Sequence, residues 1–325
     1  GSGDITLTFT GGKSSGNSRG LAVDGGTFKV LSTSGTITLI DTSPSGLTGN
    51  YNGLYLRPNA NDAIRFGADG SNVLSSSSNI IISADKLDFV TNNNKFDTSG
   101  TITINSPDGS FDAAVVIDAV ALAGSPTGFT VGKSTNTSDI TFSNALSVAG
   151  PIVAWGDDVT LTGSLVAAGA ITITANQDII LNTNTITSSA SNTDIILRAK
   201  RDITTQTNDT TSLAVTSTGG NILFTSDTDD TNGGGILILG GTVIDSNGGD
   251  ITFAGGDTSG SGYATGRSVA NSGWYIEGLR IGGTASNIVD IDSDGGNIIM
   301  RGKTSNNGGT GTSINNGNGG AGLSF

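Results

Sequence analysis

A short unit recurs along the whole 325-residue chain and constrains its fold more than any other feature. In each copy a turn of Gly, Ser or Asn precedes a small polar residue, and then Ile or Val alternates with Thr or another residue. Such alternation over four or five residues, bounded by turn residues, predicts a short β-strand. The unit occurs at 2–9, 34–40, 78–83, 99–105, 138–143, 157–163, 169–175, 177–183, 193–199, 201–207, 219–226, 233–241, 248–255 and 295–302.

The spacing of these units predicts how the strands are arranged. The first Ile or Val of successive units is often separated by roughly 20 residues, as for Ile80 and Ile102, and elsewhere by about twice that distance. This period is typical of a solenoid, in which each repeat forms one coil and strands of successive coils stack in parallel about 4.8 Å apart. We therefore predict an all-β parallel β-helix (β-solenoid) of about 20 residues per coil, running as one continuous domain over residues 1–325.

Composition argues against two alternatives to the solenoid. Disordered chains are rich in charge and poor in β-branched residues, whereas here charged residues are 13% and Ile, Val and Thr are frequent. A β-sandwich also has short strands at close intervals, but its core favours large aromatic side chains. Aromatic residues are only 5% of this chain, while glycine contributes 51 residues, which suits tight corners around a narrow aliphatic core.

Charge and missing residue types limit the chemistry that the chain can perform. It has no cysteine and no histidine, which removes disulfides, thiol nucleophiles and the usual general base at neutral pH. The formal net charge of −13 disfavours nucleic acid and anionic lipid, because binding either requires clustered cations. No stretch approaches the roughly 20 apolar residues of a membrane-spanning helix. We predict neither a nucleic-acid partner nor membrane insertion.

Two segments interrupt the repeat and carry most of the Tyr, Trp and Arg residues. They span 47–66 and 263–281, and we predict that they are loops or side strands projecting from the solenoid. Residues 111–123 are compatible with one short helix, because of the alanines in their second half, or with a strand, because of Val115, Val116 and Ile117. The Gly- and Asn-rich end, 304–325, predicts a flexible tail.

The phrases SGTITI, TGFTVGKSTNTSDITFSNALSVAGPIVAWGDDVTLTG and GAITITANQDIILNT resemble the filamentous-haemagglutinin type of large bacterial exoprotein. The resemblance is one of repeat style and extends over most of the chain. It implies a right-handed parallel β-helix, export by two-partner secretion, and a role in adhesion, aggregation or biofilm at the cell surface. The Asn-Pro-rich signatures of the family's secretion domain are missing, which implies an internal or carboxy-terminal segment.

One local motif suggests a calcium site. Asp290, Asp292 and Asp294 alternate along the chain and precede Gly295, as in the first half of a calcium-binding loop. The helix-loop-helix form of that loop needs Glu at its twelfth position, where Arg301 stands. The alternative interpretation is a strand with outward acidic residues that enters a turn. No other cofactor is indicated.

Parallel β-helices also include polysaccharide-active enzymes, which use paired carboxylates. The candidate pairs are Asp157 with Asp158, and Asp178 with Asp194 on neighbouring coils. Each of these residues stands where a turn enters a strand, a position at which the repeat itself favours Asp or Asn. We therefore predict that the chain is not an enzyme.

Exposed aromatic residues among small ones suggest sugar binding as an alternative function. Trp274, Tyr275 and Trp155 are candidate stacking platforms, and Arg280 is a candidate hydrogen-bond donor. Recurring Thr-x-Thr pairs, such as Thr172 and Thr174, would suit ice binding only if every coil kept them, and other coils do not. The sequence thus predicts an extracellular structural or adhesive segment, whose partners are neighbouring segments of the same protein, filament subunits or surface glycans.

Overall fold

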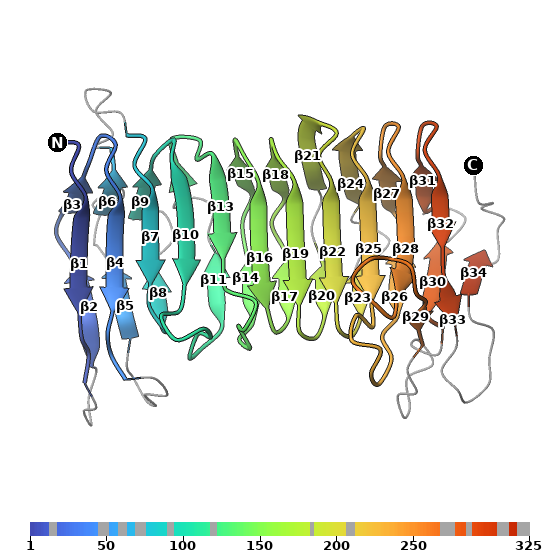
Figure 1. The fold of residues 1–325 in the computed structure, drawn as a ribbon, viewed down its shortest axis with the longest axis horizontal. Helices are drawn as coiled ribbons and strands as arrows, with labels where there is room; N and C mark the ends of the chain where they lie inside the picture. The colour runs from blue at the N-terminus through green and yellow to red at the C-terminus, as the bar shows by residue number, and fades with distance from the viewer. Residues whose placement is uncertain are drawn as a thin grey trace. The chain divides into compact units, whose positions relative to one another are not determined.

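A computed structural model describes most of the chain, and all of its regular structure is β (Figure 1). The chain forms two compact units, unit 1 (Gly1–Gly156) and unit 2 (Asp157–Phe325), each with most of its contacts within itself. The described residues are 1–12, 18–44, 52–57, 64–68, 76–89, 94–117, 122–182, 185–205, 212–266, 277–283, 288–303 and 312–316.

Unit 1 is built from coils that each contribute one strand to each of several parallel sheets. Its largest sheet stacks β1, β4, β7, β10, β13 and β16 in chain order, and smaller sheets join β2, β5 and β8, then β3, β6, β9 and β12, and finally β11 and β14. These strands pair in parallel, as do β1 and β4. The strands are β1 (Ile5–Phe9), β2 (Arg19–Asp24), β3 (Phe28–Leu31), β4 (Ile37–Asp41), β5 (Asn52–Arg57), β6 (Ile64–Gly67), β7 (Ile80–Ser83), β8 (Leu87–Phe89), β9 (Asn94–Asp97), β10 (Thr101–Asn105), β11 (Val115–Ile117), β12 (Leu122–Ala123), β13 (Gly128–Val131), β14 (Ile140–Phe142), β15 (Leu146–Val148) and β16 (Ile152–Gly156).

Unit 2 repeats the same plan with three principal sheets. One stacks β19, β22, β25, β28 and β32, the second β17, β20, β23, β26, β30 and β34, and the third β18, β21, β24, β27 and β31. The strands are β17 (Val159–Leu161), β18 (Leu165–Ala167), β19 (Ile171–Ala175), β20 (Ile179–Leu181), β21 (Thr185–Ser191), β22 (Ile195–Ala199), β23 (Ile203–Thr205), β24 (Leu213–Thr218), β25 (Ile222–Ser226), β26 (Ile236–Leu239), β27 (Thr242–Asp245), β28 (Ile251–Gly255), β29 (Ala264–Thr265), β30 (Leu279–Gly283), β31 (Asp290–Asp292), β32 (Ile298–Met300), β33 (Gly302–Lys303) and β34 (Thr312–Asn316). The predicted parallel β-solenoid is therefore confirmed.

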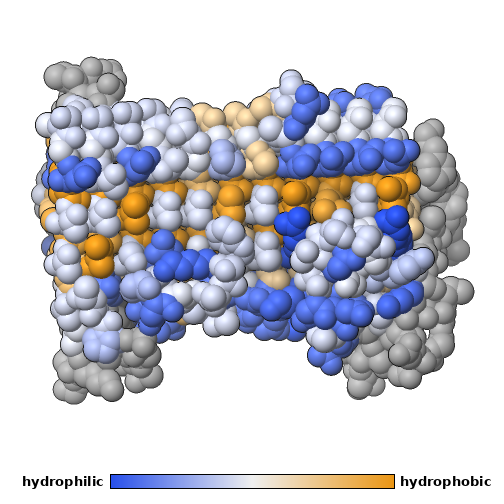
Figure 2. All heavy atoms as spheres, in the orientation of Figure 1, coloured by the Kyte–Doolittle hydropathy of each residue, from blue (hydrophilic) through white to orange (hydrophobic). Residues whose placement is uncertain are grey.

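The core consists of columns of inward aliphatic side chains, one from each coil. In unit 2, Ile171, Ile195, Ile222 and Ile251 occupy the same register position in successive strands and are fully buried. Burial of one such side chain stabilises the fold by about 1.5–3 kcal/mol. The outward positions of β19 and β22 are half-exposed, and Figure 2 shows orange, apolar side chains among pale and blue ones on the viewed face.

Coil length varies more than the predicted period of about 20 residues. Neighbouring corners are 20 residues apart at Asp158 and Asp178, and 24 apart at Asp178 and Asp202. Elsewhere they are 32 apart at Asp4 and Thr36, and 47 apart at Asp250 and Asn297. The strands pair in register at the short and the long spacings alike, so the stacking register is kept while the sequence period is lost.

Some segments that the sequence set apart from the solenoid belong to its sheets. Strand β5 lies within the segment 47–66, β6 begins inside it and ends at Gly67, and β30 begins inside 263–281 and ends at Gly283. The described part of the expected tail forms β34, which pairs with β30. Of the two readings of residues 111–123, the strand is the one found, as β11 and β12.

Candidate functional site

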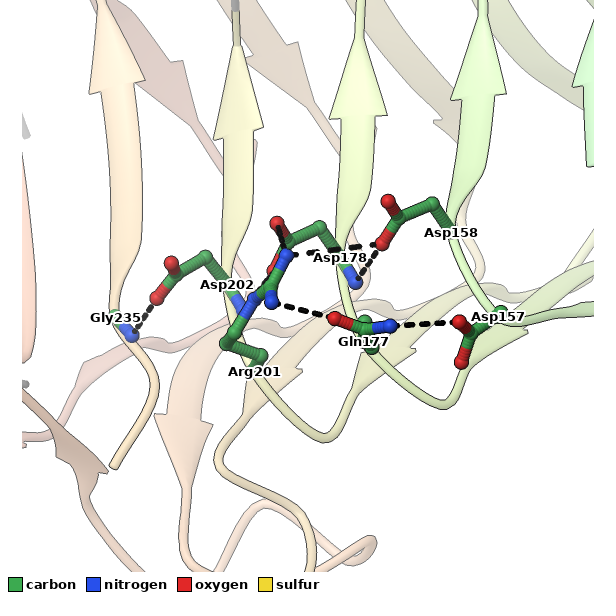
Figure 3. A network of polar contacts seen from close by, with 7 residues as sticks. All are labelled: Asp157, Asp158, Gln177, Asp178, Arg201, Asp202 and Gly235. Carbon is green, nitrogen blue, oxygen red and sulfur yellow. Dashed lines mark hydrogen bonds and ion pairs between the residues drawn. The ribbon is translucent and has the colours of Figure 1, made fainter. Parts of the chain in front are cut away.

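A row of aspartates joins successive coils of unit 2 at the corner before β17, β20 and β23 (Figure 3). Asp158 Oδ1 accepts a 2.9 Å hydrogen bond from the backbone N–H of Asp178. Asp178 Oδ1 accepts one of 3.0 Å from the N–H of Asp202, and Asp202 Oδ1 accepts one of 2.8 Å from the N–H of Gly235. We call Asp158, Asp178, Asp202 and Gly235 the Asp ladder. Each carboxylate thus bonds to the main chain of the following coil, where the chain turns before it enters the next strand.

Arg201 balances the negative charge of this ladder. Its Nε donates to Asp178 Oδ1 at 2.5 Å, its Nη2 donates to Asp178 Oδ2, and its Nη2 lies 3.8 Å from Asp158 Oδ1. The hydrogen bond to Asp178 raises the pKa of Arg201 above its already high value, so the guanidinium stays charged. Carboxylates on neighbouring coils repel one another, and a two-pronged Arg contact offsets that repulsion.

Polar contacts continue from Arg201 along the outside of the corner. Arg201 Nη1 donates to Gln177 Oε1 at 2.5 Å, and Gln177 Nε2 donates to Asp157 Oδ2 at 2.6 Å. The carboxylates of Asp157, Asp158 and Asp178 are therefore all bonded within the corner. These contacts link the corner of one coil to that of the next, which is the structural role that the repeat position suggests.

A second ladder lies before β22, β25, β28 and β32 and alternates Asp with Asn. Asp194 Oδ1 accepts from the N–H of Asn221 at 2.8 Å, and Asn221 Oδ1 accepts from the N–H of Asp250 at 2.9 Å. Asp250 Oδ1 accepts from both the N–H and the side-chain amide of Asn297, at 2.7 and 3.0 Å. We call these four residues the Asx ladder. Asp178 and Asp194, paired in the sequence as candidate catalytic groups, thus belong to different ladders at different corners.

The turn that precedes the Asx ladder is built from buried serines and close-packed glycines. In each turn the serine hydroxyl donates a hydrogen bond to the backbone carbonyl of the glycine three residues later. The distances are 2.6 Å for Ser217, 2.5 Å for Ser246 and 2.7 Å for Ser293. The second glycine of each turn lies against the preceding coil, and a Cβ on Gly249 would lie 2.2 Å from the carbonyl oxygen of Gly220. The sequence signature Ser-x-Gly-Gly-Asx-Ile at 217–222, 246–251 and 293–298 therefore marks one repeated corner.

The candidate calcium residues fall in the last of these turns. Asp292 Oδ1 accepts a 2.9 Å hydrogen bond from the N–H of Asp294, which has a left-handed backbone with φ of 50°. One coil earlier, Asp245 accepts at 2.8 Å from the N–H of Asn247, whose φ is 48°. The same turn thus forms with Asn in place of Asp294. Within the described ranges, no group of three or more acidic side chains is placed to hold a metal ion.

The candidate sugar-binding residues fall in different parts of the chain. Trp155 is half-exposed at an outward position of β16 in unit 1, and Arg280 lies on β30 in unit 2. Trp274 and Tyr275 lie outside the described residues. Sugar binding and calcium binding both stay predictions from the sequence.

Two buried carboxyl groups were not singled out by the sequence patterns as titratable sites. Asp85 in unit 1 is 1% exposed, and its Oδ1 lies 2.5 Å from Ser106 Oγ, which also lies 2.7 Å from Asp108 Oδ1. Burial raises the pKa of Asp85 to about 7, and Asp108 raises it further while Ser106 lowers it. In unit 2, burial raises the pKa of Asp227 to about 6. No short motif distinguishes these two aspartates from those in exposed turns.

Comparisons with known proteins add no relative. No protein-family model, curated protein or solved structure matched this chain. Among the described residues, no helix has the length and apolar character needed to cross a membrane.

Proposed function

We propose that the protein is a structural segment of a larger bacterial surface protein, in which its solenoid units act as rigid spacers for adhesion or aggregation. The observation that carries this proposal is the use of the corner carboxylates of unit 2. Asp178 bonds to the next coil through the N–H of Asp202 and to Arg201 through both carboxylate oxygens. These side chains connect coils to one another, and such connections resist separation of the coils when the chain is pulled.

The stacking of coils supports the same role. Each coil contacts mainly its neighbours, so the stack gains stability coil by coil along its length. The coils of each unit are joined by continuous ladders of parallel strands, and corner side chains add further links in unit 2. A spacer of this kind tolerates loops of very different lengths, provided that the inward aliphatic columns and the corners keep their register.

Single-molecule force spectroscopy of the full chain, held at its two ends, tests the proposal. We expect unfolding in successive steps, each of which releases one or a few coils. The coil between Asp178 and Asp202 has 24 residues, so its release adds about 8 nm of extended chain. Arg201→Leu should lower the force of the steps that belong to unit 2. If the chain unfolds at a force too low to resolve, and Arg201→Leu does not change that force, the proposed role as a rigid spacer is contradicted.

A further inference from the structure

The first coil of unit 1 has one stacking surface that the described part of the chain leaves uncovered. Its strand β1, at the blue end of the ribbon in Figure 1, pairs with β4 alone among the described strands. Ile5 and Leu7 point inward from β1, yet both are half-exposed. Their register partners on β4, Ile37 and Leu39, are 0% exposed. The inward columns of unit 1 therefore end in apolar side chains that are accessible to water.

Gly3 indicates which neighbour this surface suits. At other corners that lead into strands of the same sheet, a glycine packs against the preceding coil so closely that a Cβ would overlap a backbone carbonyl oxygen. Such pairs are Gly35 on Gly3, Gly100 on Ser78, Gly150 on Thr127, Gly220 on Thr193, Gly249 on Gly220 and Gly296 on Gly249. Gly3 occupies the same position, two residues before the first inward Ile, but it is exposed, and a Cβ on it would meet nothing within 4 Å. Its missing side chain therefore suits the carbonyl group of another coil of this kind.

The coil of unit 2 that contains β32 has the matching surface. Strand β32 pairs with β28 alone among the described strands, and its inward residues Ile298 and Met300 are half-exposed. Their register partners on β28, Ile251 and Phe253, are 0% exposed. This surface thus exposes the same kind of inward side chain as the surface beside β1. We call Gly3, Asp4, Ile5 and Leu7 the leading end, and Gly296, Asn297, Ile298 and Met300 the trailing end.

Two hydrogen bonds join neighbouring corners of the Asx ladder, one in each direction. Asp250 Oδ1 accepts from the backbone N–H of Asn297 at 2.7 Å. In the opposite direction, the N–H of Ile251 donates to the carbonyl oxygen of Asn297 at 2.8 Å. Each corner thus offers a side-chain acceptor and a backbone donor to the coil that follows it.

The first two coils of unit 1 are joined by the same pair of contacts. Asp4 Oδ1 accepts from the N–H of Thr36 at 2.7 Å, and the N–H of Ile5 donates to the carbonyl oxygen of Thr36 at 2.9 Å. A leading end placed on a trailing end can repeat this pattern. The Oδ1 of Asn297 would accept from the N–H of Asp4, and the N–H of Ile298 would donate to the carbonyl oxygen of Asp4. Asp4 and Asn297 are both exposed, so a partner can reach these groups.

The side chains that would face each other across this contact are compatible in charge. Asp250, Asn297 and the Asp4 of a second copy would alternate carboxylate with amide, as the Asx ladder already does. No two carboxylates would then be neighbours at this corner, which avoids the repulsion of like charges. The remaining pairs are uncharged and are Ile298 with Ile5, Ile299 with Thr6 and Met300 with Leu7.

We propose that the leading end of one copy of the chain binds the trailing end of a second copy, so that β1 of one copy pairs in parallel with β32 of the other. A second copy is the partner that fits, because this chain itself supplies both halves of the contact at matching positions. Exposed strand edges are ready templates for such pairing. The two surfaces differ, so each added copy leaves one end of each kind available for another. This inference goes beyond the spacer role, because it assigns a partner to two specific surfaces.

Sedimentation velocity of the full chain over a range of concentrations tests the proposal. We expect a reversible equilibrium between monomers and dimers or longer species. Gly3→Ala should lower the association constant at least about tenfold, because the added methyl group would overlap the carbonyl oxygen of Gly296 in the second copy. Thr6→Val is the matched control, since the side chain at this position points outward and is exposed, and association should persist.

Single-cysteine variants identify the surfaces in contact. The chain has no cysteine, so Thr6→Cys and Ile299→Cys each introduce one thiol. In a mixture of the two variants, mild oxidation should produce a disulfide-linked heterodimer, because paired strands hold these residues about 4.8 Å apart. Either variant alone should form little disulfide, because the contact joins unlike ends.

Several outcomes would overturn the proposal. A parent chain that is monomeric at every concentration means that the leading end does not bind a second copy. Protection of the β1 amides from hydrogen exchange only after residues 246–303 are fused ahead of Gly1 would assign this end to a preceding coil of the same polypeptide. Association that Gly3→Ala leaves unchanged, or a mixture of cysteine variants without heterodimer, assigns the contact to other surfaces.

Two features of this design keep its outcomes separate. If Gly3→Ala prevents folding, the mixture of cysteine variants alone decides. The force measurement on single molecules does not depend on association, so a failure here leaves the spacer role to its own test.

Discussion

The carboxylate of Asp178 accepts a 3.0 Å hydrogen bond from the backbone N–H of Asp202, its counterpart one coil later. This contact repeats along two corners of unit 2, but the two corners handle charge differently. The Asp ladder places carboxylates on three successive coils and pairs two of them, Asp158 and Asp178, with Arg201. The Asx ladder alternates Asp with Asn, so that its carboxylates are two coils apart.

Removal of Arg201 should destabilise unit 2. Arg201→Gln leaves Asp158 and Asp178 facing each other across neighbouring coils without a cation, and we expect a loss of about 1–3 kcal/mol in the free energy of unfolding. Chemical unfolding followed by circular dichroism measures the change. In an Asp178→Asn background the same substitution should cost clearly less, and an equal cost in both backgrounds would contradict the charge-balancing role.

Conversion of Asn221 to Asp should create, in the Asx ladder, repulsion between carboxylates on neighbouring coils. The new carboxylate can still accept from the N–H of Asp250, so the main change is repulsion by Asp194 and Asp250. We expect a loss of about 1 kcal/mol at neutral pH and low salt, reduced by added salt.

The pH dependence of Asn221→Asp gives a second readout. Repulsion raises the pKa of the introduced carboxyl group in the folded state, so the lost stability should return as the pH falls through that pKa. Asn221→Ala removes the same side-chain hydrogen bond without adding a charge, so its cost should depend on neither salt nor pH. A loss that is independent of both salt and pH would point to packing rather than charge.

Asp85 predicts a pH dependence of the stability of unit 1. Its pKa in the folded state is raised to about 7 by burial, whereas in the unfolded chain it titrates near the ordinary value of about 3.9. The folded state therefore holds a proton that the unfolded state releases. The resulting stabilisation is complete below about pH 4 and is lost as the pH rises to about 7.

Thermal unfolding at pH 5 and pH 8 measures this effect of Asp85. The parent chain should be more stable at pH 5 in the transition of unit 1, and Asp85→Asn should reduce the difference between the two pH values. Each kcal/mol corresponds to about 2–4 °C for a unit of this size. An undiminished difference in the variant would assign the pH dependence to other groups.

The close-packed corner glycines should tolerate no side chain. A Cβ on Gly249 would lie 2.2 Å from the carbonyl oxygen of Gly220, which is backbone and cannot rotate away. We expect Gly249→Ala to cost about 3 kcal/mol, or to prevent unit 2 from folding. Gly12→Ala is the matched control, since a Cβ there meets nothing within 4 Å, and it should change stability by less than about 0.5 kcal/mol.

Local patterns in the sequence predict most of the strands, because inward Ile and Val must alternate with outward residues in any coil. They do not predict coil length, because segments such as 256–263, between β28 and β29, add residues without changing the register. Strands with irregular composition, such as β5 with its Tyr55 and Arg57, lack the alternation of Ile or Val with Thr that identifies the other strands. The position of β5 in the solenoid follows from its pairing with β2 and β8. The sequence of β5 alone does not show that pairing.

The sequence also shows that Asp or Asn recurs before the strands, but not what these residues do. Their partners are backbone groups 20 to 47 residues away, and those distances follow no fixed period. Arg201 stands directly before Asp202 in the chain, yet it pairs with Asp178 of the preceding coil. Only the stacking register identifies that contact.

Parallel, in-register stacking of coils is the central claim, and engineered cysteine pairs test it most directly. The chain contains no cysteine, so two introduced thiols can react only with each other within one molecule. Thr172 and Ile196 are cross-strand neighbours in unit 2, as are Thr6 and Thr38 in unit 1, and adjacent strands about 4.8 Å apart suit disulfide geometry. We predict that each pair, changed to cysteine, forms a disulfide on mild oxidation, whereas Thr172→Cys with Arg198→Cys, a diagonal pair about 8 Å apart, does not. Efficient cross-linking of the diagonal pair and none of the register pairs would contradict the solenoid described here.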